Sequence, residues 1–167
     1  MYKMMPDLPP LCLNGTWKYA IDADETGRDK KFYAEGTDCS AWKDMTIPTN
    51  WYLTEVGDYF GTIWFRTTFR TPAHYAGKKI FLRFAAVDYY ADVWLNGKYL
   101  GSHEGMFNPF EFDVTATIRM DGETYWSSGT TPRAPTRSTS LRSTRRIRCP
   151  GTTSATRRST STWSRAT

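Results

Sequence analysis

Hydrophobic and polar side chains alternate along several short segments between residues 15 and 115. In residues 63–69, Ile63, Phe65 and Phe69 alternate with Trp64, Arg66 and Thr68. Successive side chains of a β-strand point to opposite faces of a sheet, so this pattern predicts a half-buried strand. The same alternation predicts strands at residues 17–22, 42–48, 80–84, 91–95 and 110–115.

The segments between the predicted strands are rich in Gly, Pro, Asn and Asp. The dipeptide Asn96-Gly97 separates two apolar segments, and a type I′ turn needs two residues that tolerate positive φ. We therefore expect Asn96 and Gly97 to form the turn of a tight hairpin, with a structural role. No long segment keeps a helical period, and the chain is predicted to be an all-β, antiparallel sandwich.

Charge is distributed very unevenly along the chain. The whole sequence has 22 Lys and Arg against 17 Asp and Glu, but residues 127–167 contain nine Arg and no Lys, Asp or Glu. The body of the chain is therefore mildly acidic. The tail is dominated by Ser, Thr and Arg and has few large apolar residues, so it is predicted to be disordered.

Three segments of the sequence, taken in order, indicate a protein family. They are LNGTWKYAID, IPTNWYLTEVGDYFGTIWFRTTF and FLRFAAVDYYADVWLNGKYLGSHEGMFNPFEFDVT, in that order. Together they resemble the N-terminal sugar-binding domain of glycoside hydrolase family two, which includes β-galactosidases, β-glucuronidases and β-mannosidases. The resemblance covers residues 13–122 and implies a jelly-roll sandwich related to galactose-binding domains. An N-terminal arm, residues 1–12, precedes it.

The resemblance also implies what this chain lacks. In such enzymes the sandwich packs against an immunoglobulin-like domain and a (β/α)8 barrel, and two barrel glutamates hydrolyse the glycosidic bond with retention. A chain of 167 residues is too short for a sandwich and a barrel of about 250 residues. We therefore expect no catalytic residue here and a noncatalytic module of a β-glycosidase, whose partners are carbohydrate and the missing domains.

The loop between the second and third predicted strands holds the best candidates for contact with a sugar. It contains Glu55, Asp58, Tyr59 and Phe60. Carboxylates accept hydrogen bonds from sugar hydroxyls, and aromatic faces stack on sugar C–H surfaces. In galactosidase-like members the equivalent loop lines the sugar site. The alternative is that these residues only pack against the domain or cap its elements.

His103 and Glu104 follow the predicted hairpin and are candidates for an interface with another domain or for solvated positions. Trp51 and Trp64 are expected in the core, although either has the ring needed to stack on a sugar. The sequence shows no Cys or His spacing of a zinc site, and we predict neither metal nor cofactor. The first ten residues lack the apolar segment of a secretory signal, which predicts a cytoplasmic protein without a membrane span.

The composition changes abruptly after Glu123, where family members continue with a strand of the type G-E/K-N-x-L-x-V-R. This chain instead reads GETYWSSGTTP. A plausible codon series for GENVLVVRHDP yields this sequence when one base is removed from the Asn codon. Our hypothesis is that residues 124–167 are a disordered frameshift product, leaving a sandwich at residues 13–123 that lacks one strand and has an open, aggregation-prone edge.

Two alternative functions follow from other features of the sequence. One is a free-standing carbohydrate-binding module that binds sugar by itself. The Arg-rich tail is instead typical of a disordered arm that binds nucleic acid through charge. The codon argument favours the frameshift over the arm, so we expect no nucleic-acid partner.

Overall fold

The computed structural model describes residues 9–131, and side chains up to residue 125. Most of the predicted tail, residues 132–167, therefore lies outside the described residues. The described part is almost entirely β-structure, in agreement with the pattern of the sequence. No helix among these residues has the length and apolar composition needed to cross a bilayer.

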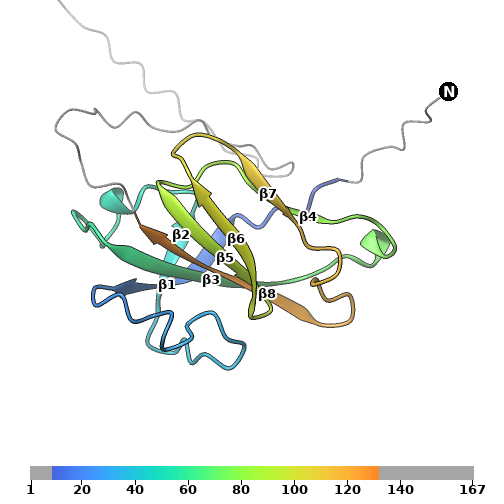
Figure 1. The fold of residues 1–167 in the computed structure, drawn as a ribbon, viewed down its shortest axis with the longest axis horizontal. Coiled ribbons are helices and arrows are strands. Elements are labelled where there is room, and N and C mark those ends of the chain that lie inside the picture. The colour runs from blue at the N-terminus through green and yellow to red at the C-terminus, as the bar shows by residue number, and fades with distance from the viewer. Residues whose placement is uncertain (1–8, 132–167) are drawn as a thin grey trace, which may run out of the picture.

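The strands form two antiparallel sheets (Figure 1). The larger has the order β2-β1-β3-β8-β5-β6 and the smaller pairs β4 with β7. The six strands of the larger sheet are β1 (Gly15–Asp22), β2 (Lys43–Ile47), β3 (Thr62–Arg70), β5 (Tyr90–Leu95), β6 (Lys98–Glu104) and β8 (Glu123–Thr131). The smaller sheet contains β4 (Phe81–Phe84) and β7 (Phe110–Asp113). Two 3-10 turns, η1 (Trp51–Leu53) and η2 (Ala73–Tyr75), flank β3.

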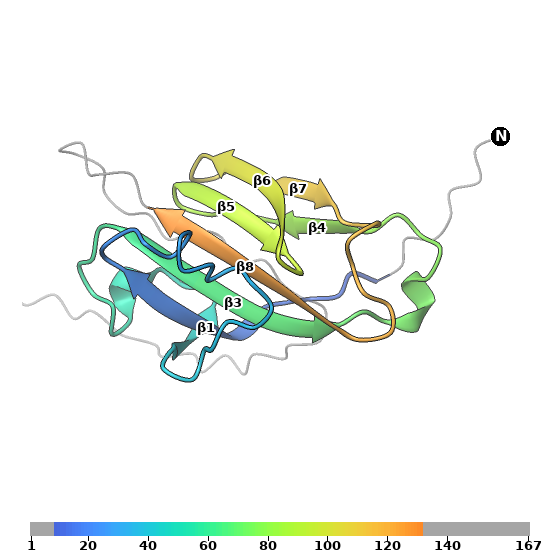
Figure 2. The ribbon, with the colours of Figure 1, turned by 60° about the horizontal axis from the view of Figure 1, so that its bottom comes forward.

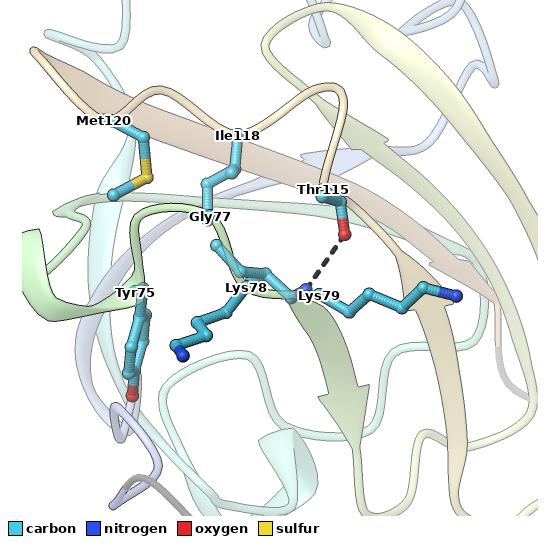
Figure 3. A pocket seen from close by; sticks show the side chains of 8 residues that line it. Tyr75, Gly77, Lys78, Lys79, Thr115, Ile118 and Met120 are labelled. Atoms are coloured by element: carbon cyan, nitrogen blue, oxygen red, sulfur yellow. Dashed lines mark hydrogen bonds between the residues drawn. The ribbon is translucent and has the colours of Figure 1, made fainter.

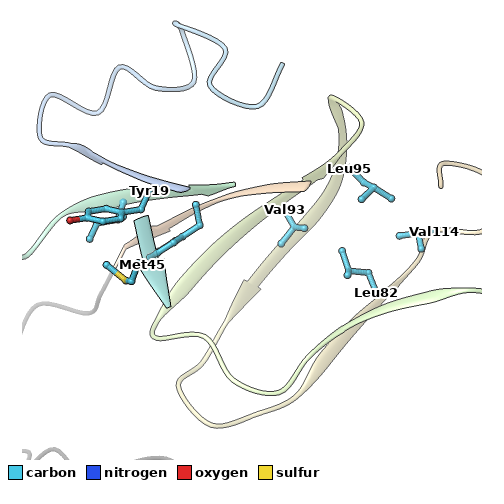
Figure 4. Close-up of a cluster of buried hydrophobic side chains, with 8 residues drawn as sticks. Tyr19, Met45, Leu82, Val93, Leu95 and Val114 are labelled. Atoms are coloured by element: carbon cyan, nitrogen blue, oxygen red, sulfur yellow. The ribbon is translucent and has the colours of Figure 1, made fainter. Parts of the chain in front are cut away.

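The smaller sheet lies beside the larger one (Figure 2), and the main hydrophobic core contains side chains from both sheets (Figure 4). Ile63 and Phe65 of β3 contribute from the large sheet, and Leu82 of β4 from the small one. The other buried members are Tyr19, Met45, Val93, Leu95 and Val114. Each side chain of this kind stabilises the folded state by about 1.5–3 kcal/mol when it is removed from water. The predicted two-layer arrangement is therefore confirmed.

A second apolar cluster lies on the opposite face of the large sheet. Trp64 and Trp94 point there, since they alternate along their strands with members of the main core, and Trp42 joins them. The connection between β1 and β2, residues 23–42, covers this face and adds Phe32 and Tyr33. Its aromatic rings pack tightly, with the Tyr33 ring stacked on Trp94 at 5.3 Å between centroids.

The covering segment corrects the prediction of a half-buried β3. Residues Ile63 to Arg66 are buried on both faces, and only the second half of the strand becomes exposed. Sequence alternation did not reveal this because the covering segment looked like a polar loop. The correction agrees with the prediction that Trp64 is a core residue, since it is 1% exposed.

Two buried charged residues hold the covering segment in place. Arg66 donates hydrogen bonds to the carbonyl oxygens of Ala34, at 2.7 Å, and Glu35, at 3.1 Å. Asp22 accepts from the indole Nε1 of Trp64 at 2.9 Å and from the amide of Gly27 at 2.8 Å. A side chain at position 27 would clash with both Trp64 and Asp22, so glycine is required there.

The predicted hairpin is present between β5 and β6. Leu95 pairs with Lys98, and the two turn residues Asn96 and Gly97 have φ of 50° and 76°. Asn96 does more than turn the chain, because its Nδ2 donates to the carbonyl of Thr117 at 2.8 Å and its Oδ1 accepts from the amide of Tyr125 at 3.2 Å. The turn therefore also fixes the start of β8.

Strand β8 corrects the predicted start of the tail at residue 124. The chain continues as a strand to Thr131 and lies between β3 and β5, in the interior of the large sheet. Thr124 is fully buried and Tyr125 is 5% exposed beneath the guanidinium of Arg66, 4.4 Å from its ring centroid. The predicted open edge at this position is therefore wrong: the two edge strands of the large sheet are β2 and β6.

Candidate functional site

The connection between β2 and β3 is held in shape by its own polar contacts. Asn50 caps η1 by accepting a hydrogen bond from the Tyr52 amide at 3.1 Å. Trp51 donates from its indole to the carbonyl of Tyr59 at 3.3 Å, and its ring stacks on Phe65 of the core. Trp51 is thus directed inward, as predicted, and it anchors the loop to the sandwich. The loop is positioned before any ligand binds.

Glu55 is occupied by contacts within the domain. Its carboxylate accepts a hydrogen bond from the Tyr19 hydroxyl at 2.7 Å and pairs with the Lys43 ammonium at 3.3 Å. These contacts, the Tyr19 hydrogen bond first, lower the pKa of Glu55. Burial, followed by the hydrogen bond to Glu55, raises the pKa of Tyr19 to about 12. Glu55 therefore ties the loop to β1 and β2.

The other three predicted loop residues divide into one inward and two outward positions. Tyr59 is half-buried against the main core, and its hydroxyl donates to the carbonyl of Thr62 at 3.4 Å. Burial raises its pKa. Asp58 is exposed, and Phe60 is exposed by 56%. Of the four candidates, Asp58 and Phe60 present a carboxylate and an aromatic ring to the surroundings.

Two further apolar side chains on this loop are exposed. Leu53 at the end of η1 is 78% exposed and Tyr52 is 52% exposed. A sequence reading based on carboxylates and sugar chemistry did not single them out. Together with Phe60, they make this connection a place where several large apolar side chains are exposed.

The hairpin pair His103 and Glu104 points to opposite faces of β6. The His103 ring stacks on Phe110 of the small sheet at 4.0 Å between centroids. Its Nε2 is buried and makes no hydrogen bond to the residues that the structure describes. Glu104 is on the other face, where its carboxylate accepts from the Tyr90 hydroxyl at 3.2 Å. The two residues are neighbours in sequence but do not form a joint site.

A shallow pocket of about 260 Å³ lies at the far end of the small sheet, and no residue predicted for function lines it. Tyr75, Lys78, Ile118 and Met120 form part of its wall (Figure 3). The Thr115 hydroxyl there accepts a hydrogen bond from the backbone amide of Ile80 at 2.9 Å. The ammonium groups of Lys78 and Lys79 point in different directions, so they do not converge on one anion (Figure 3).

The described residues contain no cluster of three His, Cys, Asp or Glu side chains arranged to hold a metal ion. The loop between β2 and β3 presents the exposed Asp58 and Phe60 on the two-sheet scaffold and is the candidate functional site. These features define a jelly-roll β-sandwich module.

Comparison with known proteins identifies the family. The profile of the glycosyl hydrolase 2 galactose-binding domain-like family matches residues 40–156, and the chain belongs to this family. A β-glucuronidase from Paenibacillus borealis is 31% identical over 107 residues, which cover 62% of this chain and 18% of that protein. A β-galactosidase from Thermoanaerobacter pseudethanolicus is 38% identical over 76 residues, covering 46% of this chain and 10% of that protein.

Solved structures give the same picture. The β-glucuronidase from Ruminococcus gnavus, crystallised with D-glucuronic acid among other ligands, aligns with 75% of this chain and 23% of its own. The complex with an N1-substituted uronic isofagomine superposes with a TM-score of 0.66 at 27% sequence identity. This chain thus spans less than a quarter of the length of these relatives, and it matches their noncatalytic N-terminal domain.

Proposed function

We propose that this chain is the N-terminal module of a retaining β-glycosidase of the glucuronidase and galactosidase type. In the complete enzyme it supports the catalytic barrel. The observation that carries the proposal is the restricted match: the chain aligns with only 18% of a β-glucuronidase and 10% of a β-galactosidase. The two glutamates needed for hydrolysis with retention belong to the part that is not matched.

The loop between β2 and β3 is the part of the module that we assign to the sugar pocket. Asp58 offers acceptor oxygens to sugar hydroxyls, and Phe60 offers a ring face to their C–H surfaces. Glu55 and Tyr59 keep the loop in place through Tyr19, Lys43 and the core. The exposed Leu53 contacts the neighbouring domain in the complete enzyme.

An activity assay of the purified chain tests the first part of the proposal. We expect no hydrolysis of p-nitrophenyl β-D-glucuronide or p-nitrophenyl β-D-galactoside above the rate in buffer, because no pair of catalytic carboxylates is supplied. Hydrolysis that copurifies with the chain and disappears on its removal would contradict the proposal.

A free-standing carbohydrate-binding module is the second candidate, favoured by the exposed Asp58 and Phe60. Titration with galactose, glucuronic acid and mannose separates the two. A module that only completes a pocket with a second domain shows no millimolar binding of these monosaccharides. Binding in that range that is lost in Phe60→Ala favours the free-standing module.

A further inference from the structure

A strip of paired tyrosines and carboxylates lies on the outer face of β5 and β6, away from the small sheet. Tyr90 and Asp92 of β5 share this face with Trp94, because side chains alternate along the strand. On β6, Glu104 pairs in register with Tyr90, and Ser102 with Asp92. Tyr99 pairs with Trp94 and completes the strip.

Each tyrosine hydroxyl in the strip is held by a carboxylate. The Tyr90 hydroxyl donates to Glu104 at 3.2 Å, and the Tyr99 hydroxyl donates to Asp92 at 2.8 Å. Burial, then the hydrogen bond to Asp92, raises the pKa of Tyr99, so its hydroxyl is neutral at physiological pH. These contacts fix the orientation of both rings before any ligand arrives.

The rings remain accessible although the hydroxyls are held. Tyr90 is 46% exposed and Tyr99 is 48% exposed. The covering segment of residues 23–42 stops at this point: its Arg28 forms an ion pair with Asp92, and its guanidinium lies 5.6 Å from the Trp94 ring centroid. The strip is thus the part of the outer sheet face that the segment leaves open.

We propose that this strip binds a neutral oligosaccharide. Its two ring faces provide stacking surfaces for sugar C–H groups. A carboxylate has about four acceptor positions, so Glu104 still has positions for sugar hydroxyls after it binds Tyr90, and Asp92 keeps fewer because it binds both Tyr99 and Arg28. This is a flat surface with fixed aromatic rings and hydroxyl acceptors, and it is separate from the loop that holds Asp58.

Geometry and charge restrict the ligand further. Trp94, the register partner of Tyr99, is four residues from Tyr90, which places the backbones of the two tyrosines about 13 Å apart along the strand. The Tyr99 side chain extends back toward Asp92, to which its hydroxyl donates. A chain of sugars that runs along the strand covers both rings more fully than a single pyranose does. Arg28 neutralises Asp92, but Glu104 keeps the strip acidic, so a uronic acid polymer is repelled.

Titration of the full chain with β-1,4-galactotriose, galactose and trigalacturonate tests the proposal by calorimetry or by amide chemical shifts. We expect the trisaccharide to bind with a millimolar or lower Kd, and galactose and trigalacturonate to bind at least about 10-fold more weakly. Failure of galactotriose to bind, or binding of galactose or trigalacturonate as tightly as galactotriose, would overturn the proposal.

Substitutions locate the binding. Tyr90→Ala and Tyr99→Ala are each expected to weaken galactotriose binding about 5-fold or more, since each removes one stacking ring. Phe81→Ala removes a similarly exposed aromatic ring, 49% exposed, from β4 of the small sheet and serves as the matched control, with no expected change. Thermal unfolding confirms that each variant is folded. Because the Tyr99 ring packs against Trp94, Tyr99→Ala can lower the stability of the domain, and in that case Tyr90→Ala decides the outcome. Unchanged affinity in Tyr90→Ala, or an equal loss in Phe81→Ala, would place the sugar elsewhere. Since Asp58 and Phe60 are on another connection, this result is independent of the monosaccharide titration above.

Discussion

At the scale of single residues, the same chemical group has different roles depending on its partners. Glu55 and Asp58 are both carboxylates on one exposed loop. Glu55 accepts a hydrogen bond from Tyr19 and pairs with Lys43, whereas Asp58 shows no comparable tie within the described residues. Glu55 therefore stabilises the position of the loop, and Asp58 is the better candidate for binding a ligand.

The pH dependence of stability distinguishes these two carboxylates. The folded state lowers the pKa of Glu55, so this group stabilises the protein above its unfolded pKa of about 4.3, and the contribution is lost as the pH falls through the lower folded value. We expect Glu55→Gln to be less stable than the wild type near neutral pH and to approach it at low pH. Thermal unfolding between about pH 2 and pH 7 measures this difference.

Asp58→Asn is the control for that experiment. It changes the same charge on the same loop, and its unfolding temperature should follow that of the wild type across the pH range. If Asp58→Asn and Glu55→Gln show the same pH-dependent loss, the stabilisation comes from the net charge of the loop and not from the contacts of Glu55 with Tyr19 and Lys43.

At the scale of elements, the covering segment and strand β8 decide how the large sheet is buried. The segment of residues 23–42 covers the outer face through the Trp cluster and through the hydrogen bonds of Arg66. Its sequence is mostly polar, and its three aromatic residues, Phe32, Tyr33 and Trp42, gave no periodic signal. Its placement depends on hydrogen bonds from Arg66 to backbone carbonyl groups, which every residue has, so the pattern of side chains could not predict it.

Removal of the Arg66 side chain tests how the covering segment is attached. Arg66→Met keeps the length of the side chain but leaves the carbonyls of Phe32, Ala34 and Glu35 without their donor. We expect a loss of about 2–4 kcal/mol in the free energy of unfolding, from several buried groups left unpaired. Limited proteolysis should also cut faster within residues 23–42. Arg70→Met, on the exposed end of the same strand, should change neither quantity.

The frameshift hypothesis makes a prediction about β8. Ser127 lies in register opposite Arg66 and Trp94, and Ser128 opposite Phe65 and Val93, all of which are buried. The restored frame places Val at both positions. We expect Ser127→Val with Ser128→Val to raise the free energy of unfolding by about 1–3 kcal/mol, as apolar groups replace hydroxyls between buried neighbours.

Chemical denaturation measures this gain, and Thr131→Val is the control, since its register partner Tyr90 is exposed. A destabilised double variant would show that the present sequence suits β8. Sequencing of the gene across codon 124 is the direct test: an uninterrupted family-like continuation in the present frame would remove the hypothesis. The family profile matches as far as residue 156, beyond the proposed site of the frameshift, so either sequencing result is informative.

At the scale of the whole molecule, the chain corresponds to 18% of a related β-glucuronidase, and large apolar side chains of its β2–β3 connection remain exposed. Since β8 fills the sheet position expected to be open, we expect this exposed connection to be the main source of self-association.

Substitution of two exposed apolar residues tests that source. Leu53→Asp combined with Phe60→Ser should lower self-association of the purified chain, because it removes exposed apolar surface without touching the core. Sedimentation velocity over a range of protein concentrations measures the effect. Phe81→Ser, which removes a similarly exposed ring from the small sheet, is the control. Equal effects of both changes would indicate general hydrophobicity and not a defined surface.

The sequence by itself determined the class of fold, the positions of most strands and the Asn96-Gly97 turn. These properties depend on local rules: a strand alternates its faces, and positive φ favours Asn and Gly. Tertiary structure alone decided which strands are covered on both faces, which loop carboxylate already has partners, and that residues 124–131 lie inside the sheet. These properties depend on contacts between distant residues, such as Tyr19 with Glu55 and Arg66 with Ala34, and alternation along one strand contains no information about the partner that will cover it.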